Sequence, residues 1–407
     1  MSAALAALHL AEPDLAALRG LGDREWDDAL AYCDRARLTL ALGAAAASVL
    51  PARVRERLDA NAGRNAERIR RMEAAYRELA ASLSAANTPF LVLKGLTHGA
   101  PFGIRPEQRQ QYDIDLFSPP ADVHNARDVL LTIGYEPIEG TENFPTDHLP
   151  AMVRKTAWEW KGDYFDVEIP LPVELHFQFW NGDIERLKAP GTDAFWGRKV
   201  TRPVAGIDLP VLQPADALAF AALHLLKHIL RGSAHPSHVY EIACFLNAHA
   251  EDRSFWDEWL SLHQPPLRRL EAVVFRLASD WFGCRLAPQA AAEVERLPPA
   301  TRAWFDEFAT APARSEFDSN KDELWLHLTL LESRHDVWSV MRRRLFPANL
   351  PLRAGSRHIP ESERTWRRRL RAGMRYAGHT VSRTWHHAVA LPRTAASGLR
   401  WWRRARG

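Results

Sequence analysis

The sequence predicts an α+β protein in which a short mixed β unit lies between two helical regions. Two changes of hydrophobic period support this prediction. Residues 65–86 carry an apolar stripe at three- and four-residue steps, which is typical of an amphipathic helix. Residues 90–93 then form a continuous apolar run, which suits a strand buried on both faces, and the helical period returns from Pro214.

Composition divides the chain of 407 residues, which is long for a single core, into four parts. We expect a helical region over 1–86, a β-containing unit over 87–212, a second helical region over 213–350 and a basic tail over 351–407. The formal net charge of +3 hides an asymmetry, because residues 353–407 contain fourteen arginines, no lysine and only two acids. An acidic body therefore carries a basic tail.

The cysteines and the N-terminus indicate a reducing compartment. The three cysteines, Cys33, Cys244 and Cys284, are far apart and form no CxxC pair, so neither a disulfide framework nor a zinc cluster is expected. The N-terminus lacks the cationic start of a signal peptide, and the most apolar run, residues 38–50, is too short to span a bilayer. We expect a cytoplasmic protein.

The centre of the β unit is the stretch Tyr112-Asp113-Ile114-Asp115-Leu116-Phe117. Side chains two apart on a strand share a face, so both aspartates project into one small volume. Two carboxylates that close require a proton, a basic group or a metal cation, and Mg²⁺ is a usual occupant of such a pair. Taken alone, the pair also fits a solvated strand face.

A second β signal lies between Ala157 and Trp180. Residues 158–160 and 173–179 both alternate, which predicts two further strands, and Glu174, His176 and Gln178 share one face of the later strand. Glu174 is the best candidate for a third acid beside the aspartates. Asp166 and Glu168 take that role if the register of the strands differs, and are otherwise exposed.

Two-metal phosphoryl chemistry needs carboxylates that bridge the cations, a close approach of backbone to phosphate, and cationic side chains. Lys94 and Gly95 follow the first strand, and Arg109 lies four residues before Asp113. Each required part therefore has a candidate in this sequence.

The order of these motifs resembles the uncharacterised nucleotidyltransferase family of the DNA polymerase β-like superfamily. The matching elements are Phe90-Leu-Val-Leu-Lys94-Gly95, Arg109, Asp113-Ile-Asp115-Leu, a helix ending Ile133-Gly134-Tyr135, and Val173-Glu174-Leu175-His176. The resemblance covers most of residues 1–350 and is specific over 90–135. It implies that residues 87–212 form a small polymerase β-like palm that uses Mg²⁺ to transfer a nucleoside monophosphate from an NTP to an acceptor, releasing pyrophosphate.

The resemblance also implies roles for single residues. Asp113, Asp115 and Glu174 would hold two Mg²⁺ ions, while Lys94, Gly95 and Arg109 would position the triphosphate. The superfamily's Gly-Ser is replaced here by Gly95-Leu96, which removes a hydroxyl contact to phosphate. A catalytically degenerate protein that only binds or recruits partners is therefore the alternative.

Several features are left open by the sequence. His176 is either a partner of the carboxylates or a buried core histidine. His224 and His228 lie four apart on one helical face, where packing or contact with the acceptor is favoured over a metal. Neither the acceptor nor the nucleotide is specified.

The basic tail also has three readings: a solvated terminus, a contact to anionic lipid that would place the protein at the membrane periphery, or a contact to nucleic acid. An apolar stripe favours a surface helix, and its members are Trp366, Leu370, Met374, Ala377, Val381 and Trp385.

Overall fold

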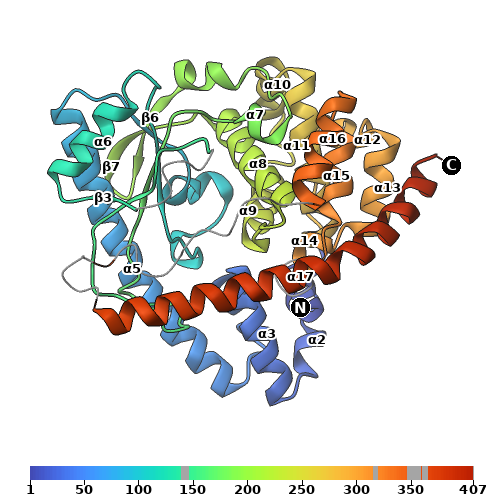
Figure 1. Ribbon diagram of the computed structural model, residues 1–407, viewed down its shortest axis with the longest axis horizontal. Helices are drawn as coiled ribbons and strands as arrows, with labels where there is room; N and C mark the ends of the chain where they lie inside the picture. The colour runs from blue at the N-terminus through green and yellow to red at the C-terminus, as the bar shows by residue number, and fades with distance from the viewer. Residues whose placement is uncertain (139–145, 315–319, 346–358, 360–364, 407) are drawn as a thin grey trace.

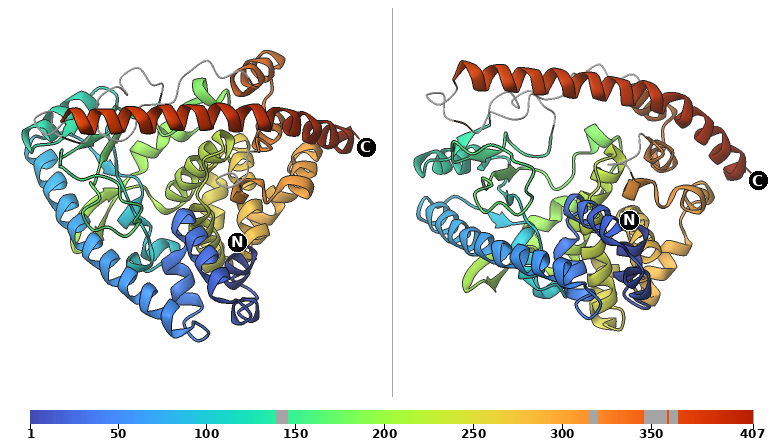
Figure 2. Two further views of the ribbon diagram at one scale, coloured as in Figure 1. Left: turned by 60° about the horizontal axis from the view of Figure 1, so that its bottom comes forward. Right: turned by 90° about the horizontal axis from the view of Figure 1, so that it is seen from below.

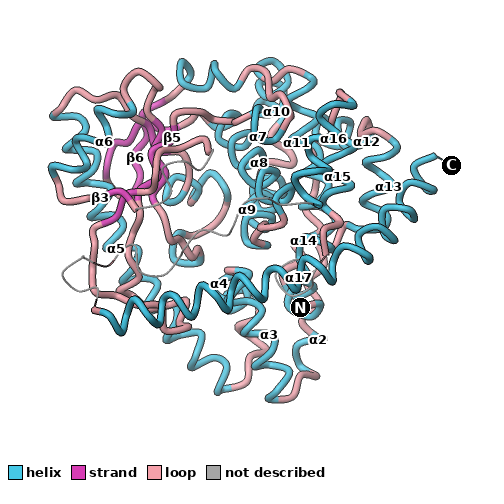
Figure 3. Tube along the Cα trace, viewed as in Figure 1, coloured by secondary structure: helices cyan, strands magenta, loops and turns pink. Residues whose placement is uncertain are grey.

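The computed structural model describes residues 1–138, 146–314, 320–345, 359 and 365–406. Within these residues, seven strands form one mixed sheet at one end of the molecule, and helices build most of the rest (Figures 1 and 3). The strands are β1 (Leu91–Val92), β2 (Ile114–Phe117), β3 (Glu136–Pro137), β4 (Met152–Val153), β5 (Val173–His176), β6 (Val200–Val204) and β7 (Ile207–Val211). Their order is β3-β4-β5-β2-β1-β7-β6, with β2 parallel to β5 and β1 parallel to β7. The α+β prediction is confirmed.

Helices precede, interrupt and follow the sheet. The preceding helices are α1 (Ser2–Ala7), α2 (Ala16–Arg19), α3 (Asp23–Ala36), α4 (Thr39–Ala45) and α5 (Ala52–Ala85). Between the strands lie η1 (Gly95–His98), η2 (Ala100–Phe102), η3 (Pro106–Gln108), α6 (Val123–Thr132), α7 (Gly182–Glu185) and η4 (Thr192–Arg198). The helices that follow are α8 (Pro214–Arg231), α9 (Pro236–Ala248), α10 (Arg253–Leu262), α11 (Pro265–Phe282), α12 (Pro288–Glu295), α13 (Pro299–Phe308), α14 (Ala311–Arg314), α15 (Glu323–Leu330), α16 (Arg334–Leu345) and α17 (Trp366–Arg406).

One face of the sheet is apolar and is covered by α5 and α6. Ile114 and Leu116 on β2, and Val173 and Leu175 on β5, are buried in one cluster with the apolar stripe of α5. The period of two along each strand sends the intervening residues to the opposite face. The alternation that buries the aliphatic side chains thus delivers Asp115, Glu174 and His176 to a single side.

The opposite face of the sheet looks toward α8 and α9. The N-terminal helices and the helices that follow the sheet share one buried cluster, which joins Trp26 and Leu42 to Leu223 and Phe275. The backbone N–H of Leu10 also donates to the carbonyl of Phe282 at 2.7 Å. The N-terminal helices and the α8–α11 group therefore pack as one body.

The structure corrects two details of the sequence prediction. Residues 158–160 do not form a strand, and the antiparallel neighbour of β5 is β4, since Met152 pairs with Val173. The helix that contains residues 65–85 starts earlier than the stripe suggested, at Ala52. All three cysteines are free. Among the described helices, none combines the length and the apolarity that crossing a bilayer requires.

Candidate active site

Asp115 and Glu174 lie side by side on neighbouring parallel strands. The register of β2 and β5 pairs Asp115 with Glu174 and Phe117 with His176. Asp113 precedes β2 and is 29% exposed at its side chain, whereas Asp115 is fully buried. Two elements far apart in the sequence therefore bring acidic groups together on the face that looks toward α8.

Lys94 places its ammonium group among these carboxylates. Its Nζ lies 3.2 Å from Asp115 Oδ2, 3.7 Å from Asp113 Oδ2 and 3.2 Å from His224 Nε2. The side chain is only 9% exposed, so water screens these charges poorly. Lys94 thus links the carboxylates of the sheet to α8.

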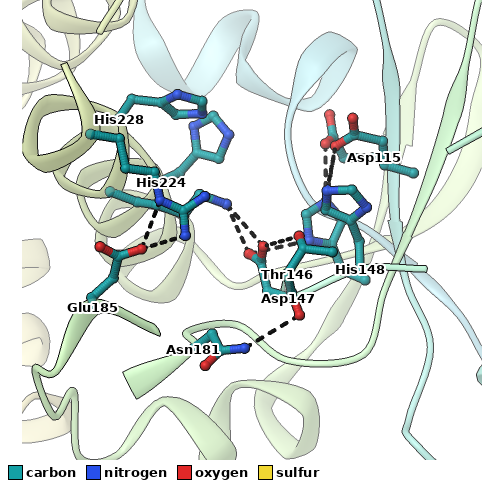
Figure 4. Close-up of polar contacts among 12 residues, drawn as sticks. Asp115, Thr146, Asp147, His148, Asn181, Glu185, His224 and His228 are labelled. Atoms are coloured by element: carbon teal, nitrogen blue, oxygen red, sulfur yellow. Dashed lines mark hydrogen bonds and ion pairs between the residues drawn. The ribbon is translucent and has the colours of Figure 1, made fainter. Parts of the chain in front are cut away.

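His176 connects the same carboxylates to a second ion pair. Its Nε2 lies 3.2 Å from Asp115 Oδ1 and 3.7 Å from Glu174 Oε2, and its Nδ1 lies 3.6 Å from Asp147 Oδ2. Lys227 on α8 donates to both oxygens of Asp147 at 2.9 and 3.1 Å. Figure 4 shows Asp115, Asp147 and His148 close together beside the strands, with His224 and His228 on the facing helix. His176 is therefore a partner of the carboxylates.

Charges of alternating sign set the protonation of this cluster. Burial opposes ionisation of Asp115, but Lys94 and His176 outweigh it and hold its pKa below the usual range. Burial likewise disfavours the imidazolium of His176, yet its three carboxylate partners raise the pKa well above that of free histidine. Burial raises the pKa of Asp113 despite the opposing effect of Lys94. His176 is thus charged and Asp113 is the carboxyl most ready to hold a proton.

Gly95 permits the chain to turn sharply after Lys94. Its φ is +80°, and a Cβ at this position would overlap the side-chain amide of Gln111. Gln111 Nε2 donates to the carbonyl of Asp113 at 2.7 Å and to the hydroxyl of Tyr76 at 3.2 Å. The absence of a side chain at Gly95 therefore lets Gln111 hold the backbone of Asp113 in place.

Arg109 faces α9 and pairs with an acid there. Its Nε donates to Glu241 Oε1 at 2.9 Å, and His98 Nδ1 lies 3.2 Å from Glu241 Oε2. Burial raises the pKa of Glu241, but Arg109 and His98 outweigh it and lower the pKa to about 2. Arg109 Nη1 is buried and has no hydrogen-bond partner within the described part of the chain. Arg109 is thus anchored by one nitrogen and keeps another unsatisfied.

Three histidines of α8 and α9 line the approach to Lys94. The ring centroids of His224 and His228 are 4.6 Å apart, and those of His224 and His238 are 5.5 Å apart. Burial, and then the charge of Lys94, holds the pKa of His224 and of His238 well below that of free histidine. Burial and Lys227 lower the pKa of His228 to about 3. These rings are therefore neutral groups that can donate or accept a hydrogen bond.

The donor set fits a divalent cation. One ligand atom from each of Asp115, Glu174 and His176 lies within 4.8 Å of the others, the one such group among the described residues. Because a protonated imidazole has no free lone pair, the carboxylates of Asp115 and Glu174 are the ligands of this group, and His176 lies beside them as their partner. Asp115 Oδ2 is buried and has no hydrogen-bond partner there, although Lys94 lies close to it. His224 and His228 do not belong to any group of this kind within the same residues. The place for a metal is therefore at β2 and β5 and not on α8.

The other acids considered from sequence lie elsewhere. Asp166 accepts a hydrogen bond from Trp158 Nε1 at 2.9 Å, and Glu168 pairs with Arg71 at 3.1 Å. Gln178 follows the end of β5 and is exposed. Asp147, Lys227 and Glu241 are the polar residues that sequence reasoning missed. None of the three belongs to a local sequence motif. The one available sequence signal was Glu241, an acid within the otherwise mostly apolar stretch that forms α9.

Comparison with known proteins gives one match. Residues 22–283 match the model of a protein family described as "Uncharacterised nucleotidyltransferase". The matched range contains β1 to β7 and every residue of the cluster described above. No curated protein matches the chain, and no solved structure matches it.

Proposed function

Because the chain belongs to the uncharacterised nucleotidyltransferase family, we propose that it transfers a nucleoside monophosphate from an NTP to an acceptor and releases pyrophosphate. The observation that carries this proposal is the pairing of Asp115 with Glu174 on parallel strands, with Lys94 beside them. A site that handles a triphosphate needs both clustered acids for cations and a fixed basic group for phosphate.

Asp113, Asp115 and Glu174 would hold two Mg²⁺ ions. His176 would orient Asp115 through the contact between its Nε2 and Asp115 Oδ1. When bound, such ions neutralise the charge that develops on phosphate oxygens. Asp147, which Lys227 holds, lies within ion-pair distance of His176 Nδ1, so the orientation of Asp115 would depend on α8 as well as on the sheet. The partly exposed carboxylate of Asp113 would face the substrate.

Lys94, Gly95 and Arg109 would position the triphosphate. Lys94 brings a buried positive charge, and the glycine turn that follows it at Gly95 fixes the direction in which the chain leaves the first strand. Arg109 has an unsatisfied Nη1 that suits an oxygen acceptor. The acceptor's oxygen would bond to the α-phosphorus and lose its proton near the carboxylates, while the bond from that phosphorus to the bridging oxygen breaks and pyrophosphate leaves.

The second candidate is a catalytically degenerate protein that keeps the fold, binds a nucleotide or nothing, and recruits partners through its basic C-terminal helix. The observation that favours it is that Lys94 and His176 already neutralise Asp115 without a cation. The Gly95-Leu96 sequence, with no hydroxyl for phosphate, points the same way.

A labelled-NTP assay with candidate acceptors tests the first candidate. The double variant Asp113→Asn with Asp115→Asn should abolish incorporation, whereas Asp166→Asn, which changes an acid outside the cluster, should leave it intact. Incorporation that survives the double variant would refute the mechanism. Calorimetry with Mg-NTP decides in one direction, since a protein that binds no NTP cannot be the transferase.

A further inference from the structure

Helix α17 carries a long apolar stripe that faces away from the protein. The helix spans Trp366–Arg406 and runs across the front of the molecule (Figure 1). In the view from below (Figure 2, right), α17 forms the outermost layer on the side of the molecule that faces the viewer in Figure 1. Six large apolar side chains recur mostly four residues apart along its first two thirds and are 50–69% exposed: Trp366, Leu370, Met374, Val381, Trp385 and Val389. We call these six residues the outer stripe.

The opposite side of α17 fixes the helix to the body. Ser397 Oγ donates to Asp322 Oδ1 at 2.6 Å, and the indoles of Trp401 and Trp325 stack with centroids 5.8 Å apart. His387 Nε2 lies 2.9 Å from the carbonyl oxygen of Leu345. These contacts use residues on the face roughly opposite the outer stripe, so docking of the helix leaves the stripe uncovered.

The charge of α17 has a single sign. The helix contains eleven arginines and no acidic residue. Arg367, Arg375 and Arg393 are exposed, and their positions fall within or beside the outer stripe in a projection of 3.6 residues per turn. Only Arg400 and Arg404 pair with an acid of the body, Glu307, among the described residues of this helix. The outward side of α17 is therefore apolar and cationic together.

We propose that α17 docks the protein on the surface of an anionic lipid bilayer, with the outer stripe among the acyl chains and the arginines among the headgroups. A helix of 41 residues is about 60 Å long, and a bilayer offers a flat apolar layer of that extent beneath negative charge. Trp366 at the start of the stripe and Trp385 near its end suit the interface, because the rings of tryptophan are amphipathic.

Two other occupants fit less well. Nucleic acid would satisfy the arginines but would leave six apolar side chains in water. A second copy of this chain could cover the stripe, but it would bring eleven further arginines against the first eleven. The bilayer alone matches both properties of the surface.

Sedimentation of the full-length protein with vesicles tests the proposal. Vesicles of phosphatidylcholine and phosphatidylserine in a ratio of about 2:1 should bind the protein, and pure phosphatidylcholine vesicles should bind it at least about tenfold more weakly. Leu370→Ser with Val381→Ser should weaken binding about tenfold or more, since two buried apolar side chains are lost. Raising the salt concentration should weaken it further.

The matched control is Leu131→Ser with Val200→Ser, which removes the same two residue types from exposed positions on α6 and β6. This variant should bind vesicles like the parent. The proposal would be overturned if the stripe variant and the parent bound anionic vesicles equally, or if the parent did not bind them. Two other results would overturn the proposal if the parent does not bind vesicles. One is a dimer of the parent that the stripe variant does not form, and the other is RNA binding that the stripe variant retains.

Discussion

Asp115 and Glu174 are register partners on adjacent parallel strands, although 58 residues separate them in the chain. This pairing converts two separate acidic residues into one site. Lys94 contacts Asp115, and His176 contacts both acids. Four elements therefore hold the site: the turn after β1, the strands β2 and β5, and α8 through Lys227. The consequences can be measured one residue at a time.

Glu174→Gln should remove a charge from the proposed metal site without changing its shape. We expect transfer activity to fall at least about a hundredfold, because electrostatic stabilisation of the transition state is lost. Mg²⁺ should raise the melting temperature of the parent and leave that of the variant unchanged. Glu168→Gln is the control, since that acid is exposed and pairs with Arg71. Equal activity of both variants would remove Glu174 from the site.

Gly95→Ala should destabilise the protein and lower its activity together. The φ of +80° and the overlap with Gln111 both oppose a side chain, and we expect a loss of about 1–3 kcal/mol in the free energy of unfolding. Gly63→Ala, in the exposed part of α5 where nothing lies within 4 Å, should instead gain up to about 1 kcal/mol. Urea denaturation measures both. A neutral Gly95→Ala would mean that Gln111 does not fix Asp113.

Glu241→Gln should leave Arg109 and His98 without their shared carboxylate. Its partner Arg109 is only 10% exposed, and breaking a buried pair from one side costs about 3–5 kcal/mol. The exposed pair Glu67–Arg70 gives the comparison, where Glu67→Gln should cost less than about 1 kcal/mol. Similar unfolding midpoints for the two variants would show that Arg109 finds another acceptor.

His263 should make the protein lose stability in mild alkali. Burial opposes its protonation, but Glu271 and Asp216 outweigh it and raise the pKa from 6.5 to about 9. The group is protonated more readily in the folded state, so its contribution of roughly 3 kcal/mol is complete below pH 6.5 and lost as the pH rises through about 9.

Unfolding in urea at pH 6 and at pH 9.5 checks this expectation. The difference between the parent and His263→Gln should shrink at the higher pH. Leu131→Ser, at an exposed position without a titratable group, is the control and should differ from the parent equally at both pH values. A constant difference for His263→Gln would mean that its imidazole is neutral when folded.

The sequence predicted the parts of this protein that follow from local period. The alternation around Asp115 and Glu174 placed both acids on one face, and the three- and four-residue steps predicted the helices before and after the sheet. The stripe that begins at Trp366 predicted a surface helix, and α17 is that helix. Such patterns extend over a few residues, so a single sequence is enough to recognise them.

Contacts between distant segments could not be predicted from the sequence. Asp147 reaches His176 because Lys227, eighty residues later, holds it, and Glu241 reaches Arg109 across 132 residues. Residues 158–160 alternate without forming a strand, and the indole N–H of Trp158 instead donates to Asp166, eight residues along the chain. Long-range pairing depends on the fold as a whole and leaves no periodic signal.

The core that the N-terminal helices share with α11 affects how the chain folds. Trp26 and Leu42 are buried in one cluster with Phe275, and Leu10 bonds to the carbonyl of Phe282, so these partners are more than 200 residues apart. Contacts of such separation slow folding, because a long loop must close before they form. During synthesis the first helices therefore cannot complete their part of this core until α11 has left the ribosome.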